Sequence, residues 1–118
     1  MDVKNNLYVG LRSGGRCVVT ANFETLPPRF DLRNHSPDGF EWGYNGSGPS
    51  QLALAILANE YGDQIATEYY RDFREEFVSR IVTDKWTIDS ATLDDIMSGI
   101  ADREMDSEEA QRREFNDH

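Results

Sequence analysis

The sequence predicts an α+β fold, in which an N-terminal β-hairpin, or a three-stranded antiparallel sheet built on it, packs against a buried central helix and two further helices. Polar and apolar residues alternate before residue 22, as in a half-buried strand. An unbroken apolar run follows Pro49, and two later segments repeat apolar residues every three or four positions, as helices do. These elements are expected to form one domain over residues 1–101, followed by an acidic polar tail over residues 102–118 that is frayed or helical.

The hairpin is predicted from two alternating segments, residues 7–12 and 17–21. Ser13-Gly14-Gly15 lies between them, and glycine reaches the positive φ that tight hairpin turns require. Prolines at 27 and 28 interrupt any strand, so a third strand is expected only at residues 29–32, on the edge of the sheet. Residues 85–88 form either a short strand or an extended segment that places Trp86 in the core.

The central helix is predicted to begin at Gly48-Pro49, because proline is favoured at the first helical position. Gln51 follows Gly48 by three residues and is expected to fold back onto the helix start, as in a capping box. Residues 52–58 are apolar on every side, so this helix belongs in the centre of the domain. Gly62 supplies a left-handed stop.

Two more helices are predicted after Gly62. Asp63 is the expected N-cap of an amphipathic helix over residues 64–82, whose apolar positions recur at spacings of three and four. Asp89 or Ser90 is expected to cap a third helix. The apolar pattern of this third helix fades after residue 101, which is why the tail is separated from the domain.

The negative charge lies in the second half of the chain. Residues 1–59 hold five acidic and five basic residues, whereas residues 60–118 hold 17 acidic and seven basic ones, so the net charge of −10 falls entirely there. Such a surface repels nucleic acid, so we expect no direct nucleic-acid binding and a protein partner with a basic surface. Solubility in a salty cytoplasm explains the same composition, since two Lys accompany ten Arg. Both explanations stand.

Composition excludes several other classes of protein. No apolar run approaches the roughly 18 residues of a membrane span, and the N-terminus lacks the basic and apolar regions of a signal peptide. We therefore expect a cytoplasmic protein that does not enter membranes. Cys17 is the only cysteine and reads as a small buried hydrophobe, while His35 is the only internal histidine. We expect no metal and no cofactor.

Residues 34–51 are the candidate ligand loop. Glycines before a helix are typical of loops that bind anions, but the loop lacks the Gly-Lys-Ser/Thr of a P-loop. A looser anion or nucleotide pocket is one interpretation. The other, which we favour, is a tight corner whose glycines serve backbone geometry and whose aromatic side chains plug the edge of the core. The candidate ligand residues are Arg33, Asn34, His35, Trp42, Tyr44 and Gln51.

The candidate partner-binding surface is the acidic face of the second predicted helix. Carboxylates there could meet a basic groove in a partner, and complementary potentials of this kind speed association. Neighbouring acids on a helix project in different directions, so they form no credible acid/base pair. We predict no catalytic residue and no enzymatic activity. The acidic face consists of Glu68, Asp72, Glu75 and Glu76.

The segment LRNHSPDGFEWGYNGSGPSQLALAIL, followed by a Gly-Asp pair and a tyrosine-bearing helix, resembles an uncharacterised family of small proteins from bacteria, archaea, phages and plasmids. The family hallmark is W-G-Y-x-G-x-G-P-x-Q-L-A-L-A, and the resemblance covers about residues 8–88. It implies no reaction. The occurrence of members on mobile elements implies an accessory or host-interaction role by association.

Three hypotheses follow for function. The leading one is a small acidic accessory protein of a phage or mobile element that acts by protein–protein interaction, with inhibition of a nucleic-acid-handling host defence complex as one form. The alternative is a small-molecule or nucleotide binder that uses the loop over residues 34–51. The third is a homodimer that uses apolar surface left on the third helix.

Overall fold

The alternating segments near the N-terminus form the predicted hairpin. In the computed structural model, which describes the backbone of residues 4–116 and the side chains of residues 4–105, β1 (Leu7–Ser13) and β2 (Arg16–Ala21) pair antiparallel. Gly14 and Gly15 close the turn between them with φ of 58° and 77°. The hairpin turn is therefore built on the left-handed conformations for which glycine is suited.

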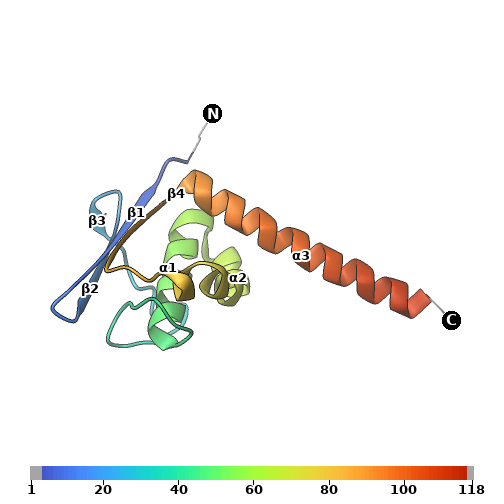
Figure 1. Cartoon of the computed structure of the whole chain (residues 1–118), viewed down its shortest axis with the longest axis horizontal. Coiled ribbons are helices and arrows are strands. Elements are labelled where there is room, and N and C mark those ends of the chain that lie inside the picture. Colours follow the sequence, from blue (N-terminus) through green and yellow to red (C-terminus); the bar gives the residue numbers. More distant parts are fainter. Residues whose placement is uncertain (1–3, 117–118) are drawn as a thin grey trace.

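The hairpin belongs to a four-stranded antiparallel sheet with the order β3-β2-β1-β4 (Figure 1). Strand β4 (Lys85–Asp89) is the expected extended segment around Trp86, and it pairs with β1. The prediction of a third strand at residues 29–32 is wrong, because the short strand β3 (Glu24–Thr25) precedes the prolines. Arg29 has a left-handed φ of 58°, and this conformation turns the chain instead of extending it.

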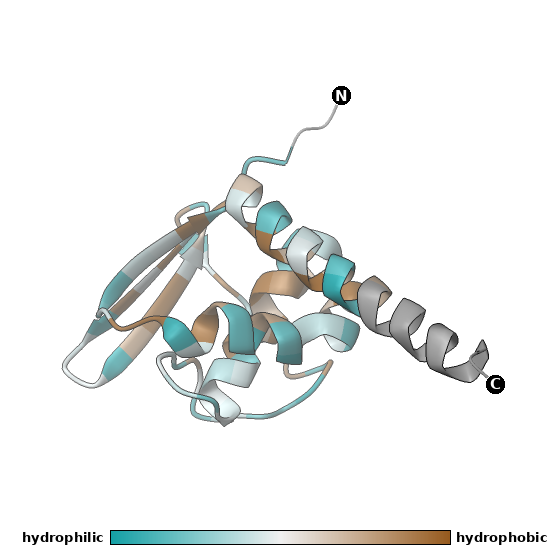
Figure 2. Ribbon diagram, turned by 45° about the vertical axis from the view of Figure 1, so that its right-hand side comes forward, coloured by the Kyte–Doolittle hydropathy of each residue, from teal (hydrophilic) through white to brown (hydrophobic). Residues whose placement is uncertain are grey.

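The apolar run forms the central helix α1 (Ser47–Tyr61), which lies between the sheet and α2 (Figure 1; Figure 2). Residues 52–57 are all fully buried, which confirms the predicted central position. The predicted capping box is wrong. Gly46 is the N-cap and no side chain caps the helix, because the Gln51 amide is occupied by loop backbone instead.

Helix α2 (Asp63–Glu76) lies beside α1 and buries Ala66, Tyr70 and Phe73 against it. Two details of its prediction are wrong. Gly62, with φ of 93°, is the N-cap and Asp63 is already helical. The helix also ends before residue 82, because a 3₁₀ turn, η1 (Val78–Arg80), places the fully buried Val78 in the core.

Helix α3 (Ser90–Asn116) starts directly at the end of β4, without a linker, and extends away from the sheet (Figure 1). The Asp89 carboxylate accepts a hydrogen bond of 2.9 Å from the Thr92 N–H, so Asp89 caps the helix as expected. The backbone helix passes residue 101 and continues to Asn116. Of the predicted tail, the side chains of 106–118 and residues 117–118 lie outside the described part of the chain. Within residues 4–116, no helix is both long and apolar enough to cross a bilayer.

Glycine at position 10 is required by the close approach of Trp86. Gly10 lies opposite Trp86 in the β1–β4 ladder, and a Cβ added there would overlap the Trp86 indole ring. We therefore expect Gly10→Ala to lower the free energy of unfolding by about 1–3 kcal/mol, as overpacking does. Gly99→Ala is the control, since an added Cβ meets nothing within 4 Å inside α3 and should stabilise by about 0.5–1 kcal/mol. Urea unfolding measures the free energy of unfolding of both variants. Equal values for Gly10→Ala and Gly99→Ala would contradict the prediction.

Candidate functional site

The buried amide of Gln51 holds the loop before α1 in place. Gln51 has 0% of its surface exposed. Its Oε1 accepts hydrogen bonds from the N–H groups of His35 (2.8 Å) and Ser36 (3.2 Å). Its Nε2 donates to the carbonyl groups of Pro28 (2.6 Å) and Arg33 (3.0 Å). All these contacts are to main chain, so Gln51 satisfies backbone groups that the loop could not pair by itself.

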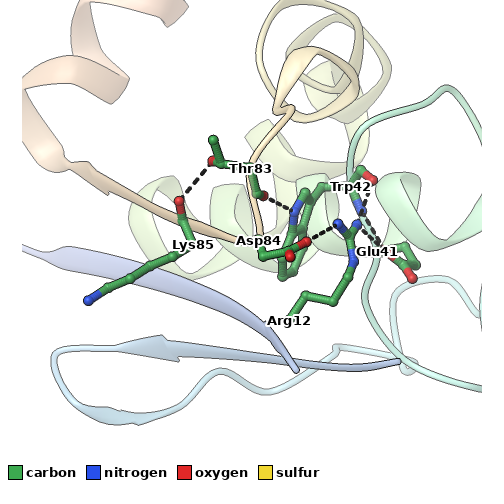
Figure 3. Close-up of polar contacts among 6 residues, drawn as sticks. All are labelled: Arg12, Glu41, Trp42, Thr83, Asp84 and Lys85. Atoms are coloured by element: carbon green, nitrogen blue, oxygen red, sulfur yellow. Dashed lines mark hydrogen bonds and ion pairs between the residues drawn. The ribbon is translucent and has the colours of Figure 1, made fainter. Parts of the chain in front are cut away.

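Trp42 is a core residue at the bend between the loop and the sheet. It is 1% exposed, and its ring lies edge to face with Trp86 at a centroid separation of 5.5 Å. Its Nε1 donates to the Thr83 carbonyl at 2.9 Å, and the guanidinium of Arg12 lies over the ring at 4.7 Å (Figure 3). Trp42 is therefore buried in the core, as the corner interpretation predicted, and it also joins the loop to β1 and to the segment before β4.

Arg12 completes this corner with two ion pairs (Figure 3). Its guanidinium contacts Glu41 at 2.6 Å and Asp84 at 3.1 Å, and it also donates to the Trp42 carbonyl at 3.0 Å. Partial burial opposes ionisation of Glu41, but the hydrogen bonds from Arg12 and the Trp42 N–H lower its pKa. The hydrogen bond that Arg12 donates to Glu41 in turn raises the pKa of Arg12. Both side chains therefore remain charged at neutral pH.

The glycines of the loop serve close packing. Gly43 has φ of 93°, and an added Cβ would lie 2.9 Å from the Ile81 carbonyl oxygen. An added Cβ at Gly48 would lie 2.6 Å from the Cβ of Glu41. These close approaches leave no room for larger residues.

The other predicted loop residues lie in different environments. His35 packs on Tyr70 with ring centroids 5.0 Å apart, and burial, aided by nearby arginines, lowers its pKa, so it is neutral at neutral pH. Arg33 and Asn34 are exposed. Tyr44 is 50% exposed and lies outside the core cluster, so the prediction that it plugs the core edge together with Trp42 is wrong.

A polar cleft of about 460 Å³ lies between the hairpin turn and the loop. Of the six predicted ligand residues, only Tyr44 is part of its lining. Arg16, Cys17 and Asp38 also line it, and sequence reasoning did not select them for a ligand, because only the folded register brings the hairpin beside the loop. Burial raises the pKa of the Cys17 thiol, which favours its neutral form.

A buried carboxylate ties the N-terminal strand to the end of α1. Glu60 is almost fully buried, and its Oε1 accepts hydrogen bonds from the Tyr8 hydroxyl (2.9 Å) and the Asn6 amide (3.1 Å). Burial, with the hydrogen bond to Glu60, raises the pKa of Tyr8 despite the opposing contact from Asn59. These bonds are internal, so Glu60 acts in the fold.

The predicted acidic face divides into two parts. Glu68, Asp72 and Glu75 are exposed, and spacings of four and three place them on one side of α2. Glu76 is partly buried and pairs with Arg103 of α3 at 2.8 Å. Glu76 therefore joins the two helices, and the other three carboxylates face solvent.

Beside these carboxylates, an apolar groove of about 220 Å³ separates α2 from α3. The Tyr61 hydroxyl donates to Asp94 at 2.6 Å, and the Tyr69 hydroxyl donates to Glu104 at 2.9 Å. Burial and the bond to Asp94 raise the pKa of Tyr61, and the bond to Glu104 raises that of Tyr69. The lining residues are Tyr61, Ile65, Tyr69, Met97 and Ala101.

The carboxylates that accept these two hydrogen bonds are not part of the groove lining. Asp94 and Glu104 are ten residues apart in α3, which corresponds to about 15 Å of helix. The lining is thus apolar apart from the two tyrosine hydroxyls, and each of these hydroxyls has a carboxylate next to it. Sequence reasoning missed it, because the apolar residues of α2 were all assigned to the core, whereas Ile65 is exposed and Tyr69 is partly buried.

The structural role of Gln51 can be tested by removing its amide. Gln51→Leu leaves four loop groups without their partner, so we expect the free energy of unfolding to fall by about 1–3 kcal/mol for each buried group that finds no water. Gln64→Leu, at an exposed position of α2, is the matched control and should change stability little. Chemical denaturation compares them. A Gln51→Leu variant of unchanged stability would contradict this structural role.

A protein-family model matches most of this domain. Residues 8–99, which include the corner around Trp42 and reach from β1 into α3, match the family of unknown function DUF6166. No curated protein and no solved structure matches the chain. Because the match covers well over half of the sequence, the chain belongs to the DUF6166 family of unknown function.

Proposed function

We propose that this protein is a non-enzymatic accessory protein that binds a basic, amphipathic segment of a partner protein on the surface formed by α2 and α3. The observation that supports this proposal is the apolar groove whose two tyrosine hydroxyls are hydrogen-bonded to the carboxylates of Asp94 and Glu104. A helix with an apolar stripe and flanking Lys or Arg side chains has the complementary pattern. Apolar contact supplies affinity in such a complex, and the charges supply orientation and rate of association.

The charge distribution supports a basic partner over a nucleic acid. Glu68, Asp72 and Glu75 lie on the solvent side of α2, next to the groove, and only Glu75 has a basic neighbour, Arg74 at 3.6 Å, among the ion pairs of the described side chains. The excess of acidic residues falls in the half of the chain that contains this surface. Phosphate groups would be repelled there.

The resemblance to proteins of phages and plasmids favours a host target for such a surface. In this form of the proposal, the protein is carried by a phage or other mobile element and occupies a basic site on a host protein. A complex that handles nucleic acid is one suitable target, since its basic groove accepts negative surfaces. Inhibition would follow from occupation of that groove.

A second candidate function is small-molecule binding in the polar cleft beside Tyr44. The cleft alone supports it. A metabolite or nucleotide that binds there would raise the melting temperature by mass action, and Tyr44→Ala would reduce the shift. A broad panel of ligands that gives no shift would remove this candidate.

Charge reversal tests the proposed partner. We expect Glu68→Lys with Asp72→Lys to weaken binding of the partner, captured from the native host and then purified, by about tenfold or more. Glu24→Lys with Asp38→Lys changes the net charge equally at exposed positions elsewhere and should have little effect. Titrations at low and high salt measure both affinities. Affinity that is indifferent to salt and to both reversals would contradict the proposal.

Filling the groove tests its apolar part without changing charge. Ala101 lines the groove and is exposed, so Ala101→Trp should occupy the space and reduce partner affinity by about tenfold or more. Ala91→Trp, also exposed on α3 but outside the groove lining, is the control. The same titration measures the affinity of both variants for the partner, and circular dichroism confirms that each is folded. Equal affinity in Ala101→Trp and wild type would exclude the groove.

A further inference from the structure

The outer edge of β4 has its backbone hydrogen-bonding groups directed away from the sheet. The bonds from Arg12 N–H to the Asp84 carbonyl (2.7 Å) and from Ser90 N–H to the Asn6 carbonyl (3.0 Å) fix the alternation of the β1–β4 ladder. In antiparallel pairs, alternate residues bond to the neighbouring strand. Residues 84, 86 and 88 therefore face β1, whereas the backbone groups of Lys85 and Thr87 and the N–H of Asp89 face outward. The Asp89 carbonyl, at the N-cap of α3, accepts the first hydrogen bond of that helix.

This edge is unpaired in the sheet of the described residues, since β4 is terminal in the strand order. The side chains of its outward-facing residues, Lys85, Thr87 and Asp89, are all exposed. An open edge of five residues is a template for another strand. The opposite edge is a poor template, because β3 has only two residues and is followed by prolines.

We infer that β4 pairs antiparallel with β4 of a second copy of this chain, about a two-fold axis at Thr87. The two Thr87 residues then face each other and exchange both backbone hydrogen bonds. Lys85 lies opposite Asp89 of the second copy, so opposite charges meet on the outer face at both ends of the strand pair. On the inner face, Trp86 lies opposite Ile88 of the second copy, which is an aromatic–aliphatic pair.

The sequence KWTID selects this register over its neighbours. A shift by two residues leaves one end of each strand unpaired and separates Lys85 from Asp89. Parallel in-register pairing would place like charges side by side, which is unfavourable. Thr83 Oγ1 already donates to the Lys85 carbonyl at 2.8 Å, but a carbonyl oxygen accepts two hydrogen bonds and can also accept one across the interface.

Charged residues on a sheet edge also serve to prevent association. A lone lysine, or several charges of one sign, would have that effect on any incoming strand. Here the two charges have opposite sign and lie symmetrically about Thr87, so each repels a strand in the wrong register and attracts an identical strand in the antiparallel one. The edge therefore favours a second copy over an arbitrary partner. The joined sheets form a symmetric dimer of the isologous type.

The experiment measures association and its site together. Sedimentation equilibrium of the full chain, up to about 1 mM because a strand pair is a small interface, should show twice the 13.5 kDa chain mass. Thr87→Lys places two like charges at the axis and should weaken dimerisation by about tenfold or more. Thr25→Lys makes the same change in the other edge strand and should leave dimerisation unchanged.

Two further readouts locate the contact. Amide exchange should slow with increasing protein concentration at Lys85, Thr87 and Asp89, and stay constant at Trp86 and Ile88, which already bond to β1. In a Cys17→Ser background, Thr87→Cys should form an intermolecular disulfide on oxidation, whereas Thr25→Cys should not, since paired Cα atoms about 5.5 Å apart are within disulfide range. A wild-type chain that remains monomeric, or a dimer that Thr87→Lys leaves intact, would overturn the inference.

Discussion

The fold depends on one constraint, which is that helix α1 has no polar face. Its residues from Leu52 to Leu57 are fully buried, so the chain must cover the helix on every side. The inner face of the sheet covers one side (Figure 1), α2 covers another, and the loop before the helix closes the remaining part. The sheet, α2 and the loop before α1 therefore take the positions that enclose α1.

Gln51 and Trp42 show how an irregular loop can meet that need. A loop laid over an apolar helix buries backbone groups, and each such group requires a partner. Gln51 supplies those partners from within the helix, and Trp42 fills the gap to the sheet under the Arg12 guanidinium. The glycines allow the chain to approach this closely. The motif that most resembles a ligand loop in the sequence thus serves packing, and the partner surface that we propose lies on α2 and α3 instead.

Periodicity in the sequence was sufficient for the main elements. Local patterns predicted the hairpin, the buried central helix, the amphipathic α2 and a cap at Asp89 or Ser90, of which Asp89 is the one observed. Sequence-based prediction was wrong where tertiary contacts determine the conformation of a segment. Arg29 adopts a left-handed turn and forms ion pairs with Asp31 and Asp63, which no local pattern shows. The α2–α3 groove and the hairpin–loop cleft were missed for the same reason, since segments far apart in the sequence form them.

The direct junction between β4 and α3 has a consequence for how this surface could change in evolution. Because Asp89 ends the strand and also caps the helix, no loop absorbs a change of length between them. One residue inserted at this junction would rotate α3 by about 100° relative to the sheet, since an α-helix has 3.6 residues per turn. Strand and helix would each persist, but Met97 and Ala101 would turn away from α2. The number of residues at this junction, more than any single side chain, determines which face of α3 meets α2.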